Sequence, residues 1–76
     1  MKGQIRNGIL LKAIGKHLRE LREERGISQE LVLFKTGIYL VRIEAGQLNI
    51  TVSTLTGLCS FYGITLEEFF AGFDYE

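Results

Sequence analysis

The stretch Ile14–Glu30, IGKHLRELREERGISQE, decides how this chain folds. It joins an amphipathic helical pattern to a glycine at Gly26 and to a Ser-Gln-Glu sequence that starts at Ser28. Glycine readily adopts the left-handed conformation that ends a helix, and serine is a preferred N-cap for the helix that follows. The stretch therefore predicts one long helix, a tight turn and the beginning of a second helix.

Helical periodicity continues along the rest of the chain. Apolar side chains between residues 11 and 21 recur at spacings of three and four, which places them on one face of the first helix. Gly37 ends the second helix, Thr51 caps the fourth, and Thr65 with Glu68 forms a capping box for the fifth. The second and third helices have the layout of a helix-turn-helix, a unit that often enters the major groove of DNA. The predicted helices cover about residues 10–25, 29–35, 38–45, 52–62 and 66–70.

A β-hairpin is the alternative for residues 31–43. Two apolar runs flank the turn Lys35–Gly37, and such runs around a glycine are typical of hairpins. Helical periodicity on both sides of this segment favours the all-helical interpretation.

The length and composition indicate one all-α domain. The chain has 76 residues, of which 46% are apolar, and this content is ample for a core and argues against disorder. We expect a flexible N-terminal tail over residues 1–8, a helix-turn-helix domain over residues 9–72 and a C-terminal tail over residues 73–76.

No pattern of reactive side chains indicates catalysis or metal binding. Cys59 is the single cysteine and falls on the inward face of the fourth helix. His17 lies on the polar side of the first helix and has no second ligand at metal-binding spacing, so we expect a surface residue rather than a metal ligand or catalytic base. We predict a protein that is not an enzyme, with no cofactor, no metal and no evident small-molecule ligand. The polar residues within 45–66 argue against a membrane span, and cysteine usage favours the cytoplasm.

Charge is distributed unevenly although the net charge is zero. Residues 1–42 hold all nine lysines and arginines with four acids, a balance of +5. Residues 43–76 hold five acids and no base, a balance of −5. This asymmetry can orient the protein on an anionic partner, and it can equally reflect head-to-tail self-association.

The chain resembles the phage-repressor and Cro-like helix-turn-helix family, also called the XRE family. The resemblance covers residues 14–70 and is carried by Ile14–Glu30, by KTGI at Lys35–Ile38, by RIEAG at Arg42–Gly46 and by TVSTLTGLCSFYGITLEEFF at Thr51–Phe70. It implies a five-helix, lambda-repressor-like DNA-binding bundle that binds two-fold operators as a dimer. It also implies an ion pair between Arg22 of the first helix and Glu44 of the third, for which two unrelated surface charges are the alternative.

The resemblance assigns DNA contacts to the start of the second helix and to the third helix. Ser28 and Gln29 occupy the first of these places, where similar proteins contact a phosphate, and an ordinary polar helix start is the alternative. Arg42 faces DNA in the family, and arginine can bond guanine bidentately, whereas a solvated surface arginine is the alternative. We expect Gln29 and Arg42 to lie side by side toward a polyanion.

The chain departs from the family between Gly37 and Arg42. Similar sequences carry about three more residues here, and those residues form the N-cap and first turn of the recognition helix. The helix is shortened with weaker specificity, or the segment has turned to protein contacts, or residues are missing from the sequence, which an intact mass would reveal. Tyr39 contacts the DNA backbone or fills the space left by the missing turn. Gln47 and Asn49 are the phosphate-contacting candidates in the next loop, which has no Lys or Arg.

An excess of apolar side chains points to an interface. Residues 31–34 are all apolar, and a helix cannot bury four consecutive side chains against one core. We predict a homodimer through the fifth helix and the Phe73–Tyr75 tail, with Leu31 and Phe34 as another contact. The predicted function is a sequence-specific, double-stranded DNA-binding regulator of transcription. The alternative is a protein-interaction or dimerisation module derived from a helix-turn-helix, with weak or lost DNA specificity.

Overall fold

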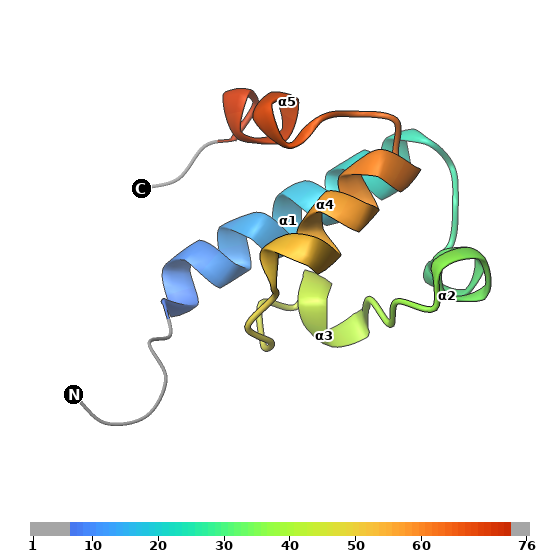
Figure 1. Ribbon diagram of the computed structural model, residues 1–76. Coiled ribbons are helices and arrows are strands. Elements are labelled where there is room, and N and C mark those ends of the chain that lie inside the picture. Colours follow the sequence, from blue (N-terminus) through green and yellow to red (C-terminus); the bar gives the residue numbers. More distant parts are fainter. Residues whose placement is uncertain (1–6, 74–76) are drawn as a thin grey trace.

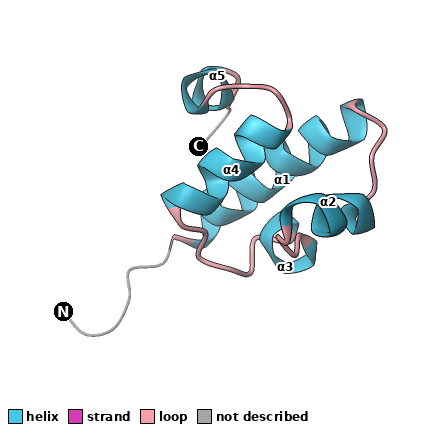
Figure 2. Cartoon of the chain, turned by 45° about the vertical axis from the view of Figure 1, so that its right-hand side comes forward, coloured by secondary structure: helices cyan, strands magenta, loops and turns pink. Residues whose placement is uncertain are grey.

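Five helices and no strand make up residues 7–73, the part of the chain that the computed structural model describes. In Figure 1 and Figure 2, α1 and α4 lie alongside each other, α2 and α3 lie on one side of them, and α5 lies on the opposite side. The all-α prediction is confirmed, and the β-hairpin alternative for residues 31–43 is wrong. None of the described helices is both long and apolar enough to cross a membrane. The helices are α1 (Gly8–Glu24), α2 (Gln29–Thr36), α3 (Val41–Glu44), α4 (Val52–Phe61) and α5 (Leu66–Ala71).

Side-chain caps set the starts of α1 and α2. Asn7 Oδ1 accepts a hydrogen bond from the backbone N–H of Leu10 at 3.0 Å. Because of this cap, α1 begins at Gly8, two residues before the predicted start and inside the predicted N-terminal tail. Ser28 Oγ accepts a hydrogen bond from the N–H of Leu31 at 3.0 Å, which confirms the predicted start of α2. Residues 1–6 and 74–76 lie outside the described residues.

The predicted caps of the last two helices are also present. Thr51 Oγ1 accepts from the N–H of Thr54 at 3.0 Å and starts α4. Thr65 Oγ1 accepts from the N–H of Glu68 at 3.0 Å, while the N–H of Thr65 donates to Glu68 Oε1 at 2.8 Å. This reciprocal pair is the capping box that the sequence predicts for α5.

The third helix begins later than predicted because the chain after α2 stays extended. Gly37 closes α2 with a φ of 77°, and Ile38 and Leu40 then both pack on the core. Tyr39, between them, points outward. Side chains alternate in this way in an extended chain, where residues two apart lie on the same side. The predicted start near Ile38 or Tyr39 is therefore wrong, and α3 covers only the four residues Val41–Glu44.

The core draws apolar side chains from all five helices. Cys59 is buried in it, as predicted for the inward face of α4. His17, predicted at the surface, is only partly exposed: its side chain is 19% exposed and its ring lies 4.5 Å from that of Phe69. Phe73 also lies near His17, with 6.1 Å between ring centroids, and packs against the core. The side chains with less than 2% exposure are those of Phe69, Leu18, Leu40, Leu58, Val32 and Cys59.

A glycine lets α1 approach the backbone of α3. A Cβ atom at Gly15 would lie 2.5 Å from the carbonyl oxygen of Ile43 and 2.6 Å from that of Glu44. No side chain fits at such distances, so the absence of one at Gly15 fixes how closely the two helices pack. This contact places the end of α3 beside the middle of α1.

Candidate nucleic-acid interface

One carboxylate fixes the start of α2 to α1 and α3. Glu44, the last residue of α3, accepts hydrogen bonds from Arg22 Nε at 2.8 Å and Nη2 at 3.1 Å. It also accepts one from Gln29 Nε2 at 2.8 Å. Arg22 Nη1 in turn donates to the backbone carbonyl of Ile27 at 2.8 Å, in the turn between α1 and α2. The network therefore joins α1, the turn, the first residue of α2 and the last residue of α3.

Burial strengthens this network. The side chains of Arg22 and Glu44 are 12% and 4% exposed, so water and salt screen the pair far less than a surface pair. The hydrogen bond to Glu44 raises the pKa of the Arg22 guanidinium above its ordinary value. The guanidinium thus stays charged, and its hydrogen bonds to Glu44 hold α2 and α3 in one relative position, which a two-helix recognition unit requires.

Ser28 and Gln29 have different environments at the start of α2. Ser28 is exposed and uses its hydroxyl as the N-cap. Gln29 is partly buried, and its amide nitrogen is engaged by Glu44, so its side chain positions α2. A phosphate at this end of α2 is left with backbone N–H groups and the helix dipole, and the exposed Glu30 in the first turn opposes it electrostatically.

Arg42 and Gln29 do not lie side by side as expected. Gln29 contacts Glu44, and Arg42 is two residues earlier in a helix that turns about 100° per residue. With Ile43 buried between them, Arg42 and Glu44 project to different sides of α3. Arg42 is exposed and forms no ion pair with any of residues 7–73. Its guanidinium is therefore accessible to a ligand, although Gln29 does not accompany it.

Tyr39 lines a shallow groove beside the start of α2. Its side chain is 60% exposed, and the groove has a volume of about 410 Å³. Ser28, Gln29, Leu33 and Val41 line the same groove, so the structure brings three of the predicted DNA-contacting residues to one place. The groove therefore lies between the start of α2 and the segment that leads into α3.

Lys12 of α1 lies next to the loop that follows α3. Gln47 and Asn49 are both exposed there, and the loop itself carries no Lys or Arg. Gly46, with a φ of 73°, approaches Lys12 of α1 so closely that a Cβ would lie 2.6 Å from Lys12 Cγ. The side chain of Lys12 thus lies beside this loop. Lys12 is far from this loop in the sequence, so the contact follows only from the packing of α1 against α3.

A family model described as helix-turn-helix matches residues 18–69, which is more than half of the chain. The chain belongs to the helix-turn-helix family. The match begins in α1 and ends in α5, so it includes the paired helices α2 and α3 and the ion pair that fixes them. The XRE-type resemblance is confirmed.

Three helix-turn-helix relatives illustrate the likeness. The chain is 36% identical over 63 residues to the HTH-type transcriptional regulator DdrOP3 of Deinococcus deserti, covering 79% of this chain and 49% of that protein. It is 36% identical over 62 residues to the HTH-type transcriptional regulator PuuR of Escherichia coli, covering 78% of this chain and 34% of that protein. It is 37% identical over 60 residues to the uncharacterized HTH-type transcriptional regulator y4dJ of Sinorhizobium fredii, covering 75% of this chain and 78% of that protein.

The chain spans about half, or less, of the length of the first two of these helix-turn-helix relatives. All three carry the names of transcriptional regulators and none that of an enzyme, in agreement with the prediction of a non-enzymatic protein. No solved structure gives a significant match to the chain. Within residues 7–73, no group of three or more His, Cys, Asp or Glu side chains is arranged to hold a metal ion.

Proposed function

We propose that this helix-turn-helix protein is a regulator of transcription that binds double-stranded DNA as a homodimer on a two-fold operator. The observation that carries the proposal is the fixed α2–α3 unit, in which Glu44 holds Gln29 and Arg22 while Arg42 forms no ion pair with the rest of residues 7–73. The names of the relatives support the same function.

The proposed binding mode relies on a small set of contacts. The start of α2 docks a phosphate through backbone N–H groups, and Arg42 bonds a phosphate or a guanine edge. Ser28 and Tyr39 line the groove beside the start of α2. Gln47 and Asn49, both exposed in the loop after α3, contact the phosphate backbone. Because α3 has only four residues, direct base readout is limited and most of the affinity is electrostatic.

A selection from a random pool of duplex DNA tests this function. A regulator enriches a two-fold sequence, and its affinity falls steeply as salt rises because binding releases counterions. Enrichment of no sequence, with equally weak binding to every duplex, would contradict sequence-specific regulation.

The length of α3 favours a second candidate, a protein-interaction module without sequence-specific DNA binding. Leu33, Tyr39 and Val41 are 40%, 60% and 45% exposed around the groove, and Phe34 on α2 is 82% exposed. An apolar surface of this kind often marks a protein interface. In the same selection this candidate enriches no sequence, while the protein still self-associates or captures a partner through this surface.

A further inference from the structure

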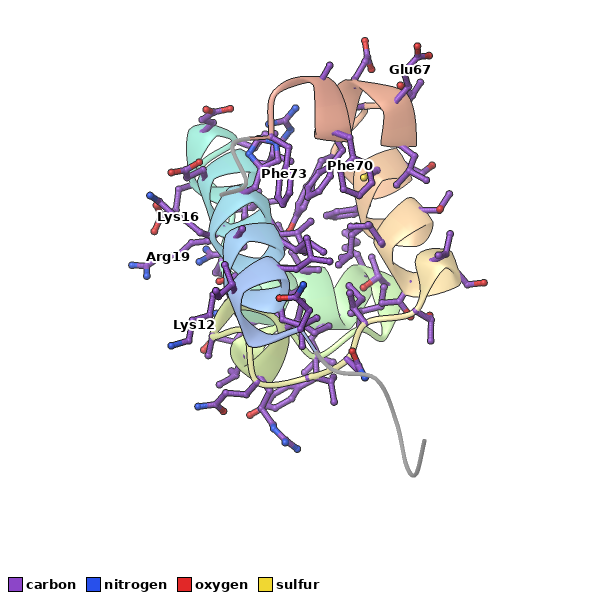
Figure 3. The ribbon with its side chains drawn as sticks, turned by 90° about the vertical axis from the view of Figure 1, so that its left-hand side faces the viewer. Lys12, Lys16, Arg19, Glu67, Phe70 and Phe73 are labelled. Carbon is purple, nitrogen blue, oxygen red and sulfur yellow. The ribbon has the colours of Figure 1, made fainter. Side chains whose placement is uncertain are left out.

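Three cations form a stripe along one flank of α1. Lys12, Lys16 and Arg19 follow one another at spacings of four and three residues, which places them on one face of the helix. Figure 3 shows them projecting to the same side of α1. Lys12 and Lys16 form no ion pair within the described residues, and Arg19 pairs only with the exposed Glu23, at 3.0 Å. We call these three residues the α1 stripe.

Aromatic side chains occupy the area next to the α1 stripe. Phe70 is 44% exposed, and its ring centroid lies 5.3 Å from that of Phe73. Phe73 in turn lines a groove of about 480 Å³ together with Ile9, Lys12 and Lys16. The groove therefore has apolar walls and cationic side chains. It opens beside the ring of Phe70, which the described part of the chain leaves partly exposed.

An acidic side chain lies across the aromatic pair from the α1 stripe. Glu67 is exposed on α5, three residues before Phe70, so the two share a face of that helix. Glu67 has no ion-pair partner within residues 7–73. In Figure 3 the cations lie on one side, Glu67 lies on the other, and Phe70 and Phe73 lie between them.

We propose that this face binds a second copy of the chain through a two-fold interface. In a two-fold interface every contact between two different residues occurs twice, once from each copy to the other. A two-fold rotation about an axis near Phe73 relates the two copies. It places the α1 stripe of each copy against Glu67 of the other. Phe70 of each copy then packs into the groove beside Phe73 of its partner. This inference rests on the homodimer of the proposed function and assigns it a surface.

The mixture of positive, negative and aromatic side chains on this face favours binding of a second copy of the chain over binding of a nucleic acid. A surface for phosphates gains from cations alone, and Glu67 and the exposed Glu20 beside the groove would repel a polyanion. An apolar centre flanked by opposite charges is instead the usual composition of a protein interface. In Figure 1, α5 lies on the opposite side of α1 and α4 from α3, so a contact centred on α5 leaves α3 uncovered.

Charge reversal and its rescue test the interface. Sedimentation equilibrium at low salt is measured for the 76-residue chain, for Lys16→Glu, for Glu67→Lys and for the protein with both substitutions. Each single reversal sets like charges against each other twice in the dimer, so its dimer dissociation constant rises about tenfold or more. The combined protein again has opposite charges face to face and recovers most of the lost affinity. Lys35→Glu on α2, outside this face, is the matched control and leaves dimerisation unchanged.

A separate variant tests the apolar centre. Phe70→Ser, with its fold checked by circular dichroism, shifts the protein to monomer at concentrations where the unsubstituted chain is dimeric. A dimer unaffected by Phe70→Ser, or single reversals that the combined substitution does not rescue, overturns the proposal. A chain that is monomeric at every concentration also overturns it.

The outcomes separate this inference from the regulatory function. If Lys16→Glu weakens DNA binding, Glu67→Lys strengthens it and the combination rescues no self-association, the face is a polyanion surface and the inference fails. If the rescue succeeds but no DNA sequence is enriched, the dimer surface stands and the regulatory function falls. If a two-fold sequence is enriched without rescue, the function stands and the dimer uses another surface.

Discussion

Arg22 of α1 and Glu44 of α3 form a bidentate ion pair at 2.8 and 3.1 Å, and their side chains are 12% and 4% exposed. The Gln29 amide bonds the same carboxylate at 2.8 Å, so the orientation of the two-helix unit depends on this one group. Removing one member of a buried pair leaves its partner desolvated and unpaired, which costs more than the pair contributes in isolation.

Glu44→Ala should therefore lower the free energy of unfolding by about 3 kcal/mol. Arg22 loses its main partner and Gln29 loses its acceptor, and urea denaturation of the variant measures the loss. Glu23→Ala is the matched control, because the Arg19–Glu23 pair is 62% and 52% exposed and contributes less than about 1 kcal/mol. Equal effects of the two substitutions would show that burial does not strengthen the Arg22–Glu44 pair.

Gly15→Ala should destabilise the fold by about 2 kcal/mol, because its methyl group would lie 2.6 Å from the carbonyl oxygen of Glu44 and would push α3 away from α1. Gly57→Ala is the control within another helix. A Cβ at Gly57 meets nothing within 4 Å, so alanine there stabilises α4 by about 0.5–1 kcal/mol. Thermal unfolding of both variants measures the two effects, and a Gly15→Ala protein that melts no earlier would refute the close packing.

The protein should lose stability as the pH rises into the alkaline range, and Tyr62→Phe should reduce that loss. Burial raises the pKa of Tyr62 to about 12, above the ordinary value of about 10 that applies when the chain is unfolded. The folded state thus holds the proton more tightly between these values. Its stability is complete below about pH 10 and falls as the pH rises toward about 12. Urea unfolding at several pH values should show this fall for the unsubstituted chain and a shallower one for the variant.

The same substitution has an effect near neutral pH. The buried Tyr62 hydroxyl has no hydrogen-bond partner within the described residues, so its removal should stabilise the protein by about 1 kcal/mol. Tyr39→Phe is the control, because the Tyr39 side chain is 60% exposed and its hydroxyl loses little hydration on folding. A Tyr62→Phe variant much less stable than the Tyr39→Phe variant would mean that the hydroxyl is bonded.

Local chemistry explains which parts of the fold could be predicted from sequence. The starts of α2, α4 and α5 follow from Ser28, Thr51 and Thr65, whose hydroxyl groups bond the backbone three residues later. Such bonds depend on neighbours in the chain, and the sequence contains those neighbours. The late start of α3 depends instead on Ile38 and Leu40 both reaching the core, which is a property of the packed bundle.

Long-range packing also explains the differences at the candidate site. His17 was expected at the surface because helical periodicity places it outside the apolar stripe, and Phe69 of the distant α5 covers it. Gln29 was expected beside Arg42, and the position of Glu44 relative to α2 decides otherwise. A sequence contains the residue types at these places, but the crossing of the helices determines which of them meet.

Arg42→Ala should reduce the affinity for the selected operator by about 1–3 kcal/mol and relax specificity at one base pair, if its guanidinium bonds a guanine. If Arg42 bonds a phosphate instead, affinity falls uniformly across sequences and the slope of log affinity against log salt drops by about one. Fluorescence anisotropy with selected and scrambled duplexes at several salt concentrations distinguishes the two. Lys35→Ala, which removes an exposed cation at the far end of α2, is the matched control. Identical curves for the Arg42→Ala protein and the unsubstituted chain on both duplexes would remove Arg42 from the interface.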